Sequence, residues 1–146
     1  MIISRLILKN WKNFQHVEVD LNYRTFIVGA NASGKSNLLD AILFIRDLVK
    51  QPGGGLQYAV GSVRGGVSKI RCLAARKDPE VSIEVHLSES PGEDVEWKYR
   101  VGFKHAGGGI VKHQAKITSE EVWHKNKLIL QRKASDKGED PEKLLY

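Results

Sequence analysis

Eight consecutive residues have the types and the spacing needed to hold a chain of phosphate groups. They are Gly29, Ala30, Asn31, Ala32, Ser33, Gly34, Lys35 and Ser36, in the pattern G-x-x-x-x-G-K-[ST]. Gly29 and Gly34 let the backbone curl so that its N–H groups converge on phosphate oxygens. Lys35 adds a positive charge for the outer phosphates, and the hydroxyl of Ser36 can ligate magnesium. The sequence therefore predicts a site for a nucleotide polyphosphate with Mg²⁺.

The segments on either side of this loop are the kinds that such a site requires. Residues 25–28 are nearly all apolar, which predicts a short strand buried on both faces of a sheet. After the loop, apolar residues recur at spacings of three and four, which predicts a helix over residues 36–50 that ends before Pro52. The N-terminus of that helix would direct its partial positive charge at bound phosphates. A glycine loop before a helix without a ligand is the structural alternative, and the preceding strand argues against it.

The rest of the chain alternates apolar and polar residues, the pattern of half-buried strands. The alternation around Lys12-Asn13 predicts an N-terminal β-hairpin. Further strands are predicted over residues 81–87, 95–103 and 111–117, followed by a hairpin that turns at Lys125-Asn126-Lys127. Six glycines between residues 53 and 66 predict a mobile or ligand-ordered loop there. The expected fold class is mixed α/β (α+β), with the phosphate loop and its helix between a hairpin and an antiparallel meander.

Composition excludes several classes of protein. A length of 146 residues with 41% hydrophobic residues suits one domain with a core. No apolar run reaches the roughly 18 residues that a membrane helix needs, and the N-terminus lacks the features of a signal peptide. The single cysteine, Cys72, argues against a disulfide framework and a cysteine-rich zinc site, and it favours a cytoplasmic chain. The lack of long apolar runs predicts no membrane partner. The net charge of +6 is compatible with nucleic-acid binding, although the scattered lysines and arginines favour a role in solubility.

Two short motifs around the loop carry a family resemblance. One is Asn10-Trp11-Lys12-Asn13-Phe14, and the other is Asn37-Leu38-Leu39-Asp40-Ala41-Ile42 directly after the loop. Together with the loop they resemble the ABC-type ATPase heads of the SMC, RecF and OLD-like group, including the proteins termed AAA family ATPases. The similarity is strongest over residues 1–50 and continues more weakly through Arg64-Gly65-Gly66 and the meander.

The resemblance implies that the loop binds ATP with Mg²⁺, and that two heads form a homodimer that sandwiches ATP. It also implies a role in DNA repair, recombination or defence, with DNA as a possible partner. The residues that it assigns to the nucleotide are Gly29, Asn31, Ala32, Ser33, Gly34, Lys35, Ser36, Asn37 and, from the hairpin, Asn13. Among these, Lys35 is the expected catalytic residue and Ser36 the expected Mg²⁺ ligand.

Hydrolysis in this group also needs a Walker B strand ending in Asp-Glu, a glutamine loop and a signature motif. None of these is recognisable in the sequence. The apolar run at residues 81–87 is interrupted by Glu84 and His86, and Glu120-Glu121 follows polar residues. We therefore interpret residues 1–146 as the N-terminal portion of a P-loop ATPase domain of the ABC type, which binds nucleotide without turnover by itself.

Two other functions are compatible with the loop. A nucleotide-dependent dimerisation module would bind ATP and hydrolyse little of it. A small-molecule kinase would use the same loop, but such kinases usually begin with the strand before the loop and continue with parallel strand–helix units. The N-terminal hairpin and the antiparallel meander argue against the kinase.

Overall fold

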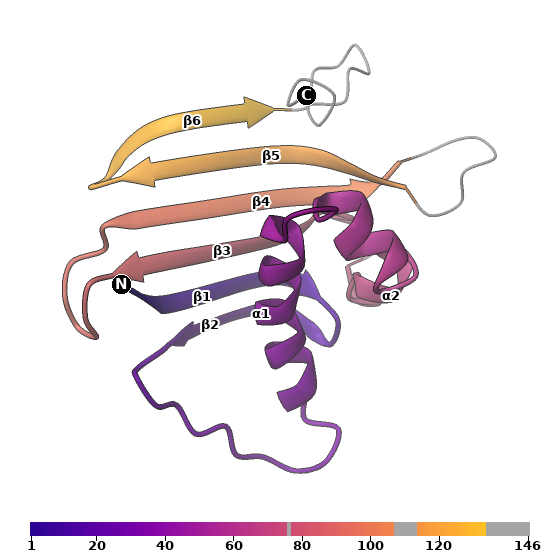
Figure 1. Ribbon diagram of the computed structural model, residues 1–146. Coiled ribbons are helices and arrows are strands. Elements are labelled where there is room, and N and C mark those ends of the chain that lie inside the picture. Colours follow the sequence, from indigo (N-terminus) through magenta and orange to yellow (C-terminus); the bar gives the residue numbers. More distant parts are fainter. Residues whose placement is uncertain (76, 107–113, 134–146) are drawn as a thin grey trace.

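The computed structural model describes residues 1–75, 77–106 and 114–133. Its strands form one antiparallel sheet in the order β2-β1-β3-β4-β5-β6, and its helices gather on one face of that sheet (Figure 1). The strands are β1 (Ile2–Trp11), β2 (Phe14–Asp20), β3 (Val81–Ser88), β4 (Trp97–His105), β5 (Ala115–His124) and β6 (Lys127–Lys133). The helices are α1 (Lys35–Val49), the π-helical turn η1 (Tyr58–Ser62) and α2 (Val67–Ile70). The expected mixed α/β class is confirmed.

Both predicted hairpins are present. β1 and β2 pair through a turn whose residue Lys12 adopts a left-handed φ of 54°. β5 and β6 are joined at Lys125 and Asn126, whose φ values of 47° and 64° are those of a type I′ turn. This turn matches the right-handed twist of its strands, which is why a two-residue connection suffices. Part of the strand predicted over residues 111–117 lies outside the described residues, and β5 begins at Ala115.

The core lies between α1 and one face of the sheet. Alternation along the strands places Leu8, Ile83 and Val101 on this face, all of them buried. Phe44 of α1 packs at their end, edge-on to Trp11 with ring centroids 5.2 Å apart and stacked on Phe103 at 5.4 Å. These aromatic contacts fix how α1, and with it the loop before α1, lies on the sheet.

The prediction of a buried strand over residues 25–28 is wrong. The segment has no strand pairing, and the side chains of Phe26 and Val28 are 88% and 92% exposed. An apolar segment becomes a strand with two buried faces only where neighbouring strands and covering layers enclose it. The strands of the described residues all belong to the antiparallel sheet, and none of them pairs with residues 25–28.

The prediction of a mobile or ligand-ordered loop over residues 53–66 is also wrong. This stretch contains η1 and leads into α2, and its apolar residues Leu56, Ala59 and Val60 are buried in the core. The glycines serve the bends between these short helices: Gly65 and Gly66 have φ values of 76° and 109°, which favour glycine. Within the described parts of the chain, no helix is long and apolar enough to cross a membrane.

Candidate functional site

The loop at residues 29–34 leads directly into the N-terminus of α1. Gly34 is the N-cap residue, with a left-handed φ of 101°, and Ala32 two residues earlier has a φ of 64°. Alternation of left- and right-handed residues is the backbone form that turns successive N–H groups into an anion-binding nest. The first bond of the helix runs from the N–H of Leu38 to the carbonyl of Gly34 at 3.0 Å. The N–H groups before Leu38 therefore have no partner within the helix and could bind an anion at its end.

The ammonium group of Lys35 lies against the loop itself. Its Nζ donates hydrogen bonds to the carbonyl oxygens of Gly29 at 2.6 Å and Ala30 at 2.7 Å. Residues 29–33 and Ser36 are exposed, whereas Gly34 is buried. A phosphate oxygen carries more negative charge than a carbonyl oxygen, so a phosphate at the loop would compete for this ammonium group.

The turn between β1 and β2 forms one wall of the loop. The Oδ1 atom of Asn13 accepts a hydrogen bond from Nδ2 of Asn37 at 2.8 Å. A Cβ atom built on Gly34 would lie 2.5 Å from Nδ2 of Asn13 and 2.8 Å from Cζ of Phe14. Only glycine fits there, both for space and for its positive φ. The structure thus brings together Asn13, Gly34 and Asn37, which the sequence places in three separate motifs.

A buried ionic network lies behind the loop, and the sequence analysis did not find it. Arg64 holds both carboxylate oxygens of Asp40, with Nη2–Oδ1 at 2.8 Å and Nε–Oδ2 at 3.1 Å. Its Nη1 atom contacts Oδ2 of Asp47 at 3.0 Å, and its guanidinium group lies over the ring of Phe44. Lys12 of the hairpin turn completes the network, 3.3 Å from Oδ2 of Asp40. The signal in the sequence was the seven-residue spacing of the two aspartates, which places them on the same face of α1.

The network lowers the pKa values of both aspartates. Burial by itself raises the pKa of Asp47, but hydrogen bonds from Arg46 and Arg64, together with their charges, outweigh it and hold the pKa below its ordinary value of 3.8. Burial likewise opposes ionisation of Asp40, and the hydrogen bonds and charges of Arg64 and Lys12 lower its pKa in the same way. Both side chains are therefore carboxylates near neutral pH.

These shifts predict a loss of stability in acid. A carboxyl group whose pKa is lower in the folded chain binds fewer protons there than in the unfolded chain, so protons favour unfolding as the pH falls through the ordinary value. We expect the free energy of unfolding from urea titrations to lose this contribution below the ordinary pKa of 3.8. The difference in the free energy of unfolding between the native chain and Asp47→Asn should become smaller over the same pH range. A difference in the free energy of unfolding that stays constant as the pH falls would contradict the lowered pKa of Asp47.

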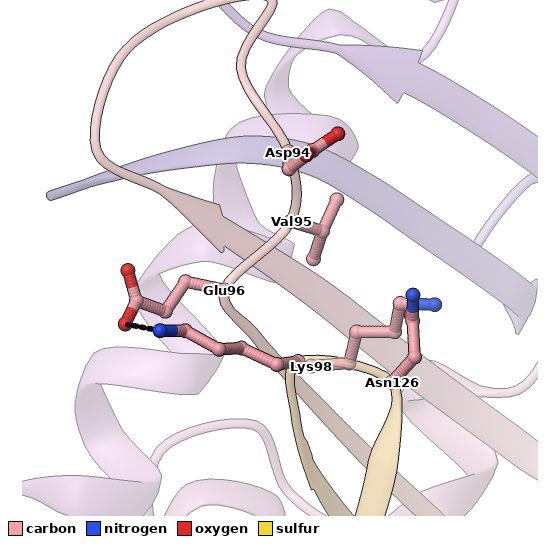
Figure 2. Close-up of a pocket in the computed structure, with 6 residues that line it drawn as sticks. Asp94, Val95, Glu96, Lys98 and Asn126 are labelled. Atoms are coloured by element: carbon pink, nitrogen blue, oxygen red, sulfur yellow. Dashed lines mark ion pairs between the residues drawn. The ribbon is translucent and has the colours of Figure 1, made fainter.

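A cavity of about 540 Å³ lies at the other end of the sheet, where β3 leads to β4 and β5 turns into β6 (Figure 2). Its lining residues are Asp94, Val95, Glu96, Lys98, Lys125 and Asn126. Charges of both signs line it, and Lys125 and Glu96 form an ion pair at 4.0 Å. It contains neither a glycine-rich loop nor a helix N-terminus, so the candidate phosphate site remains the loop before α1.

The antiparallel sheet, the loop and the helix that follows it fit an ATPase-type domain, and the family match supports that class. Residues 24–143 match the family model described as "AAA domain, putative AbiEii toxin, Type IV TA system", and the chain belongs to this family.

Curated relatives match a short part of the chain. The "DNA replication and repair protein RecF" of Glaesserella parasuis is 46% identical over 46 residues, 31% of this chain and 13% of that protein. The RecF protein of Picosynechococcus sp. is 43% identical over 49 residues, 33% of this chain and 13% of that protein. The "Chromosome partition protein Smc" of Methanocaldococcus jannaschii is 48% identical over 44 residues, 30% of this chain and 4% of that protein. The matches thus span only a small fraction of each relative.

A solved structure shares the fold over most of the chain. It comes from work described as "Structural biochemistry of ATP-driven dimerization and DNA stimulated activation of SMC ATPases". The TM-score is 0.54 at 20% identity, and the likeness covers 88% of this chain and 72% of the other. The resemblance to SMC and RecF ATPase heads is therefore confirmed, and the chain is an ATPase-type domain related to those two proteins.

Proposed function

We propose that residues 29–36 bind the phosphates of ATP together with Mg²⁺. The observation that supports this most is the left-handed Gly34 at the start of α1, which leaves the first N–H groups of the helix oriented toward the loop. In this proposal Lys35 exchanges its two carbonyl partners for phosphate oxygens, and the exposed hydroxyl of Ser36 ligates the metal. The residues that would surround the phosphates are Gly29, Asn31, Ala32, Ser33, Gly34 and Asn37.

We further propose that the chain is the N-terminal portion of an ABC-type ATPase head. The intact protein would hydrolyse ATP, using a Walker B strand and a signature motif from outside residues 1–146. Support comes from the RecF and Smc relatives and from the likeness to an SMC ATPase described by "ATP-driven dimerization and DNA stimulated activation". We also propose, by analogy with the same relatives, a homodimer that encloses ATP and acts on DNA.

A dimerisation module with little hydrolysis is the second candidate, since the described work on the SMC ATPase links ATP to dimerisation. Phosphate release by the intact protein separates the two candidates. The antiparallel sheet argues against a small-molecule kinase, whose strands are expected to be parallel.

Calorimetric titration with ATP, in magnesium and in EDTA, tests the proposal. We expect the native chain to bind ATP more tightly with magnesium. In EDTA, Ser36→Ala should bind ATP with the same affinity as the native chain. Magnesium should no longer increase that affinity, because the variant lacks the ligating hydroxyl. Ser36→Thr is the matched control, since it keeps a hydroxyl that the loop pattern accepts. An unchanged gain in Ser36→Ala would refute the metal assignment.

A further inference from the structure

Three consecutive side chains of the β1–β2 turn hold the beginning of α1. Trp11 donates from Nε1 to the carbonyl of Asn37 at 2.8 Å. Lys12 forms its ion pair with Asp40 one turn further along the helix. Asn13 accepts from the side chain of Asn37. The turn therefore contacts the helix at several points, beside the loop that precedes it.

The turn is also fixed from the opposite side. The N–H of Lys12 donates to the carbonyl of Ile70 at the end of α2, and the carbonyl of Asn10 accepts from the N–H of Cys72 at 2.8 Å. Trp11 is fully buried in the core. The turn therefore cannot move unless the core and the end of α2 move with it, so it is a rigid support for whatever it contacts.

Asn13 contacts the peptide group between Ser33 and Gly34, which leads into the left-handed N-cap residue of α1. Its Nδ2 atom donates a long hydrogen bond of 3.5 Å to the carbonyl of Ser33. In a trans peptide the C=O and the following N–H point in opposite directions. Because the carbonyl of Ser33 is directed at Asn13, the N–H of Gly34 is directed away from Asn13, on the side where the loop would hold phosphate.

We propose that Asn13 is a positioning residue. It orients the peptide between Ser33 and Gly34 so that the Gly34 N–H is ready for an oligophosphate, and it does not contact the nucleotide itself. This inference rests on the proposed function. It differs from the nucleotide-contacting role that the family resemblance implies for Asn13, because a positioning role affects every oligophosphate equally, whatever base or sugar is attached.

The test is calorimetric titration of the native chain and of Asn13→Ala with the magnesium complexes of ATP, GTP and inorganic tripolyphosphate. We expect Asn13→Ala to bind each ligand more weakly than the native chain by the same factor, about fivefold to tenfold, because one hydrogen bond is lost. Asn13→Asp keeps an acceptor for Asn37 but lacks the donor for Ser33. It should also reduce the affinity for all three ligands. Gln131→Ala is the matched control, because it removes an exposed amide of β6 that hydrogen-bonds Glu121 of β5. A loss confined to ATP, or no loss, would overturn the inference.

A second measurement needs no ligand. In amide NMR spectra of the free chain, Asn13→Ala should shift the Gly34 amide resonance, while Gln131→Ala should leave it unchanged. If the native chain binds none of the three ligands, the proposed function fails, and the Gly34 amide still decides the inference. An unchanged Gly34 amide in a folded Asn13→Ala chain would show that Asn13 does not orient this peptide.

Discussion

Replacing Lys35 with alanine will weaken the binding of magnesium ATP by about tenfold to a hundredfold. A hydrogen bond to a charged group contributes about 1.5–3 kcal/mol, and the ammonium of Lys35 lies on the loop within reach of a bound phosphate. The side chain is at the surface of the loop and is not part of the core, so the fold should persist. Calorimetry measures the loss, and circular dichroism measures the fold.

Lys125→Ala is the control for this experiment. It removes the same charge from the turn at the far end of the sheet, where the side chain is 71% exposed. General attraction of an anion by a basic chain would be reduced equally by the two substitutions, whereas a local contact is lost only at Lys35. Equal losses in the two variants would contradict a phosphate site at the loop.

Replacing Arg64 with methionine will destabilise the chain by about 3–5 kcal/mol. The side chain of Arg64 is 4% exposed and that of Asp47 is 3% exposed, so the substitution leaves a buried carboxylate without its buried partner. Methionine keeps an apolar stem against Phe44, which limits the loss of packing. The free energy of unfolding from urea titration at neutral pH measures the effect.

Arg46→Met is the matched control, because Arg46 contacts the same carboxylate at 2.8 Å but is 67% exposed. Water replaces an exposed partner at little cost, so we expect a loss below about 1 kcal/mol. Similar losses for the two arginines would show that burial does not set the strength of this network.

Local patterns in the sequence determined the elements that carry the site. The loop is recognisable because its glycines, lysine and serine occupy adjacent positions, and α1 is recognisable from the three- and four-residue spacing that follows. The two hairpins follow from alternation and from turn residues such as Lys125 and Asn126, which can adopt a left-handed conformation. Each of these features depends on neighbours within a few residues, so the sequence shows it directly.

Contacts between residues far apart in the sequence determined the remaining features of the fold and of the site. Residues 25–28 have the composition of a buried strand, yet pairing and burial depend on what lies beside them. The glycines at residues 53–66 predict a loop, but the stretch forms buried helical turns. Apolar contacts in the core outweigh the low helix propensity of glycine. Arg64 and Asp40 are 24 residues apart, and so are Asn13 and Asn37. Only the packing of α1 on the sheet brings such residues together, which is why the network and the wall behind Gly34 came from the tertiary structure alone.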